Sequence, residues 1–421
     1  MKTNISQKYT TTGEFVKQFI LVSSGKVLAL GSLFVGSIFL ARTLGTEQFG
    51  YYSSALAIIL LFDATIGAPL DNATIRFASH HVEPKRINAI QSLIFWMKVS
   101  IGFFIGGIAF IFADELSRLI FQREQANSLI LATVFSGVLL LVIRSGSNHL
   151  QINLQFKEYA RVDTIQAIIR LAFIFLMILL GITDPALYLL GIGSSALIVF
   201  ALFLSRAFPF FTRIEQRDLR TITSYIGITS LIVVIGSISG RADVPILLIL
   251  SDAEEAGLYS AAMQLAFLGS LLASYMAVIM QPRVVEMAKE GSIARLIRLN
   301  IGLAIVAGLL CIPIAIYVVP WLVPFIFGAA FADAAILLQI LLIGFVADLI
   351  IIPILMPLGL QVIPAKIFLW ELLTLMLFLG AIAAFDQISG ITMAWIVTGV
   401  RYIKLIFYGA SIYGYLRGQR S

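Results

Sequence analysis

The chain has 421 residues, of which 60% are hydrophobic and only 12% are charged, and its mean hydropathy is +0.99. This composition excludes an ordinary soluble domain. The net charge of +6 does not indicate nucleic acid as a partner, because the basic residues follow the loop pattern of a membrane protein.

Long apolar runs follow one another along the chain. A bilayer-spanning helix needs roughly 20 apolar residues. We expect about twelve such helices, near 17–41, 51–78, 89–112, 128–150, 162–182, 186–205, 222–250, 257–281, 297–320, 333–357, 365–385 and 389–414. The alternating segments typical of transmembrane strands are absent from the sequence. The predicted fold class is an all-α polytopic membrane protein.

The segment 44–55, between the first two expected helices, reads as a tight, mostly polar hairpin and has a copy in the second half of the chain. Four of its residues recur 207 positions later: Glu47, Gly50, Tyr52 and Ser53 match Glu254, Gly257, Tyr259 and Ser260. At an offset of 206, Leu119-Ile120-Phe121 matches Phe325-Ile326-Phe327. A nearly constant offset of about half the chain indicates two structurally equivalent halves, as in many transporters.

The loop charges predict the orientation. If the N-terminus is cytoplasmic, the outer face carries only Arg42, Arg118 and Arg123 as basic residues, and the other loop Lys and Arg residues lie inside. The positive-inside rule then places both termini in the cytoplasm, which requires an even number of spans. We expect no signal-peptide cleavage. We also expect no disulfide, since there is one cysteine, and no metal site, because the histidines lack ligand spacing.

Three expected helices contain residues that disfavour a straight helix. The second carries Gly67-Ala68-Pro69, the seventh carries Gly240, Arg241, Asp243 and Pro245, and the tenth carries Pro353 and Pro357. We predict bends there. Proline is also common in membrane helices for packing reasons alone, so a hinge and a static bend both remain open.

Charged residues fall inside the expected spans. The bases are Lys26, Lys98, Arg144, Arg170, Arg241, Arg401 and Lys404, and the acids are Asp63, Asp71, Asp243, Asp348 and Glu371. A charge facing lipid at mid-helix costs roughly 2.5–3.5 kcal/mol. Most of these side chains must therefore face one another or a water-filled cavity. One interpretation is structural ion pairs, for example Lys26 with Asp63.

A second interpretation is a cationic cavity, because the bases outnumber the acids. Arg401 and Lys404 are three residues apart on one helical face, so they repel unless an anion or a carboxylate lies between them. Arg241 and Asp243 face different ways and need partners on other helices. The excess of bases favours a hydrated cavity for an anionic substrate such as a phosphate or pyrophosphate.

Short motifs then connect the chain to a known family. Residues 41–52, Ala-Arg-Thr-Leu-Gly-Thr-Glu-Gln-Phe-Gly-Tyr-Tyr, followed by Ile66-Gly67 and Arg76, resemble the Wzx-type polysaccharide flippase branch of the multidrug/oligosaccharidyl-lipid/polysaccharide (MOP) exporter superfamily. Residues 323–334 are similar to the turn before its tenth helix, whereas the corresponding turn at 119–123 lacks the glycine.

This resemblance implies two pseudo-repeated six-helix bundles, at 1–206 and 223–421, joined by a basic cytoplasmic linker at 207–222, with alternating access. The implied function is that of a flippase rather than an enzyme. It would move polyprenyl-pyrophosphate-linked oligosaccharides from the inner to the outer leaflet of the cytoplasmic (inner) membrane, with ion coupling. The product would be a surface polysaccharide: the O-antigen of lipopolysaccharide, a capsule or an exopolysaccharide.

The expected partners are the lipid-linked oligosaccharide, membrane lipids and the polysaccharide polymerase and chain-length machinery, without nucleic acid or a cofactor. From the charge argument, we expect the anionic headgroup to contact Lys26, Arg144, Arg170, Arg241, Arg401 and Lys404. Asp63, Asp243 and Asp348 would couple an ion or hold those bases in place.

Three alternatives remain. A cation-coupled multidrug exporter of the same superfamily would favour an acidic cavity. A membrane enzyme such as a polysaccharide polymerase or ligase needs a sizeable outer loop, and no hydrophilic connection here exceeds about 17 residues. A non-transporting partner of a glycan assembly complex is the third. ATP binding is not expected, because no Gly-rich phosphate loop is present.

Overall fold

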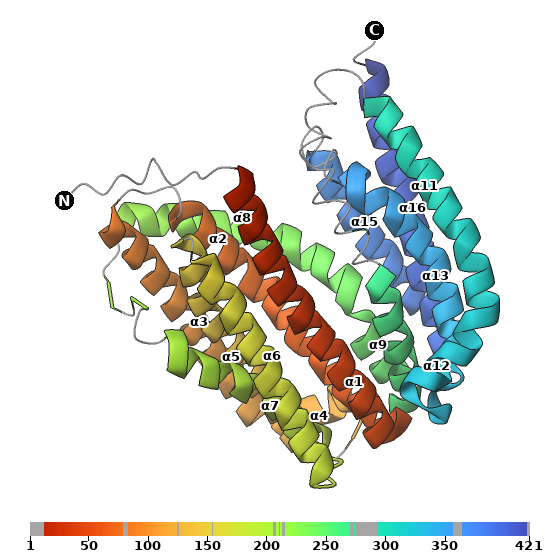
Figure 1. Ribbon diagram of the computed structural model, residues 1–421, viewed down its shortest axis with the longest axis horizontal. Coiled ribbons are helices and arrows are strands. Elements are labelled where there is room, and N and C mark those ends of the chain that lie inside the picture. The colour runs from red at the N-terminus through yellow and green to blue at the C-terminus, as the bar shows by residue number, and fades with distance from the viewer. Residues whose placement is uncertain are drawn as a thin grey trace. The chain divides into compact units, whose positions relative to one another are not determined.

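The computed structural model describes residues 12–78, 83–123, 126–153, 155–204, 208–209, 211–212, 215–269, 273, 293–356 and 364–418. Within these ranges the chain forms helices and turns without strands, so the predicted all-α fold class is confirmed. The first half (Figure 1) contains α1 (Thr12–Phe62), η2 (Asp63–Gly67), α2 (Ala68–Ala78), α3 (Pro84–Ile111), α4 (Ala113–Phe121), α5 (Asn127–Ile152), α6 (Phe156–Leu179), α7 (Pro185–Val199) and η3 (Phe200–Leu204).

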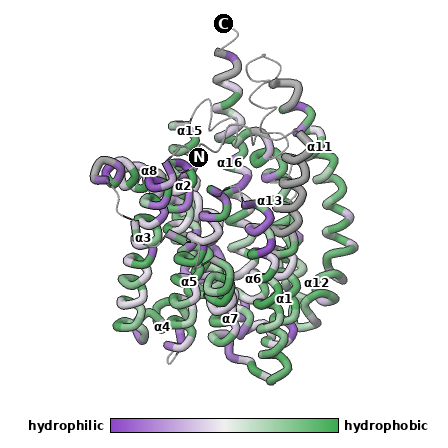
Figure 2. The backbone as a smooth tube through the Cα atoms, turned by 60° about the vertical axis from the view of Figure 1, so that its left-hand side comes forward, coloured by the Kyte–Doolittle hydropathy of each residue, from purple (hydrophilic) through white to green (hydrophobic). Residues whose placement is uncertain are grey.

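The second half begins within the linker expected at 207–222. Its helices are α8 (Gln216–Arg241), α9 (Asp243–Leu250), a helix over 253–269, α11 (Ile293–Pro313), η4 (Ile314–Val318), α12 (Val319–Phe327), η5 (Ala329–Phe331), α13 (Ala334–Ile350), η6 (Ile351–Leu355), α15 (Pro364–Ala383) and α16 (Gly390–Gly418). Apolar residues dominate along most of these helices (Figure 2).

Nine helices in the described ranges are long and apolar enough to cross a membrane, or ten if the bent pair α8 and α9 forms one span. One of them, Gly31–Ala78, covers two of the expected spans. Another expected span, 257–281, continues into residues that the structure does not describe. The count of twelve therefore stays a prediction.

The expected hairpin at 44–55 is reduced to a break at one residue. Gly45 adopts φ 72° and ψ 179° inside α1, and helical structure continues on both sides of it. A Cβ at Gly45 would meet no atom within 4 Å. The glycine is therefore required by its backbone conformation, which other residues rarely adopt, and not by crowding.

Two of the three predicted bends coincide with π-helical turns, and a third π turn lies in a helix where no bend was predicted. The turn η2 ends one residue before Ala68-Pro69, η4 follows Pro313, and η6 contains Pro353. Proline has no backbone N–H to donate, so the helix beside it can widen locally. Between α8 and α9 the chain bends by 54° around Ala242, as the glycine, aspartate and proline residues there predict.

The chain divides into two compact units, which do not follow chain order. Unit 1 comprises Met1–Leu40, Phe62–Ser117 and Glu124–Ser230, and unit 2 comprises Ala41–Leu61, Arg118–Arg123 and Leu231–Ser421. Two first-half segments thus belong to the unit that holds most of the second half. The domain boundaries expected at 206 and 223 stay a prediction.

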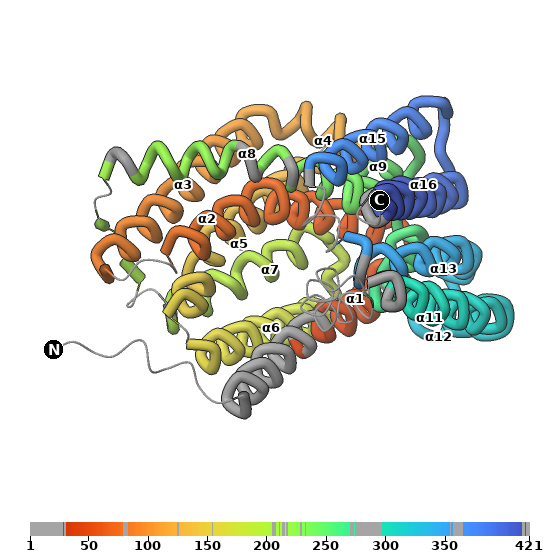
Figure 3. Tube along the Cα trace, turned by 90° about the horizontal axis from the view of Figure 1, so that it is seen from above, coloured from red at the N-terminus to blue at the C-terminus, as the bar shows by residue number. Residues whose placement is uncertain are grey.

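Each unit has its own core. In unit 1, α5 packs against α3 and α7 (Figure 3), and the buried core contains Leu70, Ile90, Ile94 and Ile222. In unit 2, α13 packs against α16 and α11, around Ala347, Ile351, Ile367, Tyr408 and Ile412. These helix packings position the charged side chains described next.

Candidate functional site

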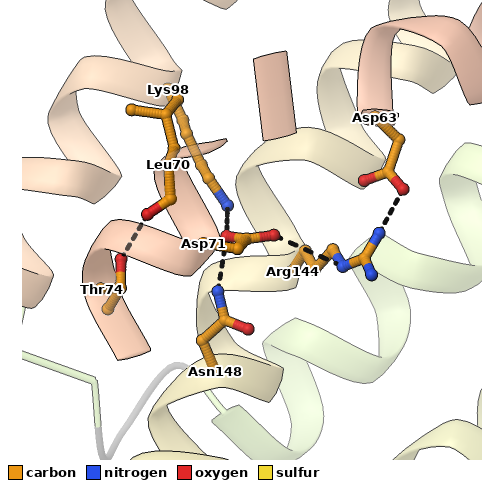
Figure 4. Close-up of polar contacts among 7 residues, drawn as sticks. All are labelled: Asp63, Leu70, Asp71, Thr74, Lys98, Arg144 and Asn148. Atoms are coloured by element: carbon orange, nitrogen blue, oxygen red, sulfur yellow. Dashed lines mark hydrogen bonds and ion pairs between the residues drawn. The ribbon is translucent and has the colours of Figure 1, made fainter. Parts of the chain in front are cut away.

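A group of polar and charged side chains lies inside unit 1 (Figure 4). We call it the Asp71 cluster; its members are Asp63, Asp71, Lys98, Arg144 and Asn148. Lys98 Nζ and Asn148 Nδ2 each donate to Asp71 Oδ1 at 2.5 Å. Arg144 Nε lies 3.4 Å from Asp71 Oδ2, and Arg144 Nη1 pairs with Asp63 Oδ2. Arg144 thus bridges the two carboxylates.

The π-helical turn η2 explains how one arginine reaches both aspartates. Asp63 and Asp71 are eight residues apart, which in a continuous α-helix would set them about 80° apart around the axis. A π turn contains more residues than an α turn, so it reduces this angle. Because η2 spans Asp63–Gly67, it lies between the two aspartates and brings both towards α5, which carries Arg144.

Burial changes steeply across the Asp71 cluster. The side chain of Lys98 is fully buried and that of Asp71 is 8% exposed, whereas Asp63 is 25% and Arg144 is 50% exposed. Two acids balance two bases, so the cluster carries no net charge when all four are ionised. Its buried end has the character of a structural ion pair, and its Arg144 end is accessible.

Two carboxylate oxygens of this cluster accept no hydrogen bond from the described residues. Asp71 Oδ2 is one of them, and Arg144 Nε lies 3.4 Å from it. The other is Asp63 Oδ1, which is buried. Since a buried carboxylate oxygen normally has a partner, this atom is suited to accept a proton or a cation.

A second charged cluster lies in unit 2, on α13, α15 and α16. Arg401 Nη1 is 3.4 Å from Asp348 Oδ2. Lys404 Nζ donates to Glu371 Oε2 at 2.9 Å, and the Tyr408 hydroxyl donates to Glu371 Oε1. Arg401 and Lys404 therefore each have their own carboxylate partner. A carboxylate was one of the two groups, with a bound anion, expected to relieve their repulsion.

Arg170 and Asp243 have hydrogen-bond partners outside the two clusters, although the charge of Arg401 also acts on Asp243. Arg170 is buried and donates to Ser32 Oγ at 2.7 Å. Asp243 accepts a 2.8 Å hydrogen bond from the Tyr259 hydroxyl, so its partner lies on another helix, as expected.

Arg241 stands apart from the other bases. It is the last residue of α8, directly before the bend, and is exposed; no ion pair among the described residues includes it. Lys26 lies in α1, but its side chain falls outside the described part of the chain, so the suggested Lys26–Asp63 pair stays a prediction. Asp63 pairs with Arg144.

Several partners were not among the candidate site residues. Asp71, Lys98 and Glu371 stood out as charges within spans, but nothing in the sequence ranked them above the others. Asn148 follows Arg144 by four residues, so the two share a helical face, and that spacing was an available signal. The sequence alone did not indicate Tyr408 as a partner of Glu371.

Comparison with known proteins identifies the family. The sequence matches the family described as "Polysaccharide biosynthesis protein" over residues 15–288. The chain belongs to this family. No curated protein matches this sequence.

Solved structures with the same fold are membrane transporters. The chain is similar to the lipid II flippase MurJ in an inward closed conformation, with a TM-score of 0.78, 14% identity and coverage of 94% of this chain and 87% of MurJ. It is also similar to an inward-facing multidrug resistance MATE transporter of the MOP superfamily, with a TM-score of 0.69, 14% identity and coverage of 96% and 100%.

A third match is a MOP superfamily transporter from Pyrococcus furiosus described as having a binding pocket of reverse polarity, with a TM-score of 0.58, 15% identity and coverage of 96% and 95%. At these identities the likeness establishes the fold. The family match and the shared fold confirm the resemblance stated from the sequence.

Proposed function

We propose that this protein is a flippase that moves polyprenyl-pyrophosphate-linked oligosaccharides from the inner to the outer leaflet of the cytoplasmic membrane. The transported units would serve the assembly of an O-antigen, a capsule or an exopolysaccharide, together with a polymerase and chain-length machinery. The observation that carries the proposal is the match to the polysaccharide biosynthesis family over residues 15–288, on a chain with a transporter fold.

The distribution of charges supports an anionic headgroup as the ligand. Guanidinium groups recognise phosphates through paired hydrogen bonds. Arg144 keeps half of its side chain exposed although it holds two carboxylates, and Arg241 is exposed at the α8–α9 bend. We therefore propose Arg241 and Arg144 as the first residues to test for headgroup contact, ahead of Lys26 and Arg170. Arg401 and Lys404, which have carboxylate partners, come last.

Ion coupling would use a carboxylate that changes its partner during transport. Asp63 combines an accessible arginine partner with a buried oxygen that accepts no hydrogen bond from the described residues. This combination supports Asp63 as the coupling residue. Asp243 and Asp348 are held by Tyr259 and Arg401, so we assign them to positioning.

The other candidate function is a cation-coupled multidrug exporter, which the likeness to a MATE transporter favours. The two functions differ in the charge of the cargo. A drug exporter would lower the sensitivity of its host to cationic drugs, and its loss would leave surface glycans intact.

The deciding experiment deletes the gene in its host, stains the surface glycan and analyses lipid-linked sugars in each leaflet. We expect surface polymer to be lost and complete lipid-linked units to accumulate on the cytoplasmic leaflet. Normal delivery of these units to the outer leaflet would exclude the flippase, and an accompanying rise in drug sensitivity would favour the exporter.

Complementation then tests the cationic residues. Arg241→Ala should restore less than a tenth of the polymer, because one charge-assisted contact contributes roughly 1.5–3 kcal/mol, and Arg241→Lys should restore more. Arg161→Ala is the matched control: Arg161 forms an exposed ion pair with Glu158 on the same helix, which contributes little. Full activity of Arg241→Ala at normal expression would remove Arg241 from the site.

A further inference from the structure

The two copies of the repeated motif contact each other inside unit 2. A Cβ on Gly50 would lie 1.7 Å from Ala253 O, and a Cβ on Gly257 would lie 2.1 Å from Thr46 O. Ala253 follows Thr46 by 207 positions, and Gly257 follows Gly50 by the same number. Gly50 therefore packs against Ala253, and its repeat equivalent Gly257 packs against Thr46, the repeat equivalent of Ala253. The contact is reciprocal.

The helices at this contact are closely packed. Phe49, Ala256 and Tyr259 are fully buried, and Tyr52 is nearly so. At the edge, Thr46 Oγ1 donates to Glu254 Oε1 at 3.4 Å, in an exposed position. Only glycine permits backbones to approach this closely, and no ion pair among the described residues fastens the two motifs.

Two further contacts flank the glycines, and each joins the two halves of the sequence. Arg42 Nε donates to Ile326 O at 2.8 Å and Arg42 Nη2 donates to Phe325 O. These carbonyls lie in the last turn of α12, which ends at Phe327 before Gly328. The last carbonyls of a helix have no partner within it, so Arg42 supplies donors that this helix end lacks.

The counterpart of that contact uses a different donor. Residue 249 is the repeat equivalent of residue 42, and the Gln122 side chain donates to Ile249 O near the end of α9. The same two surfaces meet at both places, but the donor lies on the first-half segment in each case: Arg42 on α1 and Gln122 just after α4. Both contacts therefore close a helix end of the second half with a first-half side chain.

We propose that Arg42 and Gln122 are releasable clamps that hold the reciprocal glycine contact closed and let it part during each transport cycle. Both are positioning residues, since they act through helix ends and not on the substrate. The part of this proposal that concerns the transport cycle rests on the proposed function. Arg42 is exposed, and its bonds end on neutral carbonyls, so water can replace them when the contact opens.

The first test measures opening without any transport. Cys311, the only cysteine, is replaced by alanine, and Thr46→Cys serves as a half-buried reporter beside the contact. Labelling with a membrane-impermeant maleimide is followed in vesicles of both orientations. With Arg42→Gln, we expect labelling about fivefold faster, the effect of losing one of the two hydrogen bonds of Arg42, with an intermediate rate for Arg42→Lys.

Gln122→Ala is a second variant with the same expected direction, and elution as a single monodisperse peak verifies folding for each protein. Unchanged labelling in well-folded Arg42 and Gln122 variants would overturn the clamp proposal. That outcome would leave the flippase proposal untouched, since labelling does not depend on the substrate.

The second test asks whether the contact must part for transport. Thr46→Cys and Glu254→Cys in the Cys311→Ala protein are joined by a short reagent that a reductant cleaves. We expect cross-linking to stop delivery of lipid-linked units and the reductant to restore it. The matched control is Asp114→Cys with Asn127→Cys, whose native side chains also form an exposed hydrogen bond, but within unit 1.

If a cross-link between positions 46 and 254 leaves transport unchanged, the contact is a permanent scaffold and the proposal is overturned. If lipid-linked units still reach the outer leaflet normally after gene deletion, the proposed function fails. The labelling experiment still decides on the clamps in that case.

Discussion

Asp71 and Lys98 form a buried ion pair, and Asp71 has more polar partners than Lys98. Asp71 is also held by Asn148 and lies near Arg144, whereas the contacts of Lys98 described above all end on Asp71. Loss of the carboxylate would leave an ammonium group buried without a counter-charge. Loss of the ammonium would leave a carboxylate with two remaining partners.

This asymmetry predicts unequal effects of the two substitutions. Asp71→Asn should lower the free energy of unfolding by about 3–5 kcal/mol, the cost of breaking a buried pair on one side. Lys98→Met should cost on the order of 1–2 kcal/mol. Thermal unfolding in detergent shows which variant is less stable. Equal losses of stability in the two variants would contradict the asymmetry.

For single residues, the sequence indicates which charged side chains lie within the expected spans but not which of them form pairs. Lys26 and Asp63 lie on neighbouring expected helices, and their pairing stays a prediction. The choice of Arg144 as the partner of Asp63 depends on the rotation introduced by η2 and on the packing of α5. Neither is encoded in local residue preferences.

Among the elements, the helices that begin after Gly45 and at residue 253 make the tightest backbone approach described here. An added methyl group at Gly50 or Gly257 would overlap a backbone carbonyl oxygen, which cannot move without shifting its helix. A methyl group added at Gly409 in α16 would meet no atom within 4 Å.

Gly50→Ala and Gly257→Ala should therefore destabilise the protein by about 1–3 kcal/mol or more. Gly409→Ala should leave stability unchanged or raise it by up to about 1 kcal/mol, because alanine favours the helix. Melting temperatures of the three purified variants test this. A harmless Gly50→Ala would mean that the helices approach less closely.

The bend between α8 and α9 follows from its own residues, since glycine, aspartate and proline within a few positions weaken a helix locally. The one-residue break at Gly45 was harder to foresee. The polar residues 46–50 look like a loop, yet they begin the helix that follows the break, and Phe49 and Gly50 are buried against other helices.

For the whole molecule, the repeat offset predicted two equivalent halves but not that the two copies of the motif would touch. The placement of Ala41–Leu61 and Arg118–Arg123 in unit 2 also goes beyond the sequence. Such contacts join residues far apart in the chain, and periodicity gives no information about them.

Orientation in the membrane is the remaining prediction at this scale. In the Cys311→Ala protein, Thr183→Cys lies at an exposed position expected outside, and Glu83→Cys at an exposed position expected inside. An impermeant maleimide added to intact cells should label the first and not the second, because the basic loops hold the second face in the cytoplasm. The opposite pattern would invert the topology.

The reciprocal approach of Gly50 and Gly257 has the form of an interface in a symmetric dimer, where the same surface is used by both partners. A six-helix ancestor that paired with its own copy would have made this contact, and any single mutation there would have changed it twice. Once the two copies were joined in one chain, each could change independently. The arginine on one side and the glutamine on the other are the kind of divergence that such a fusion permits.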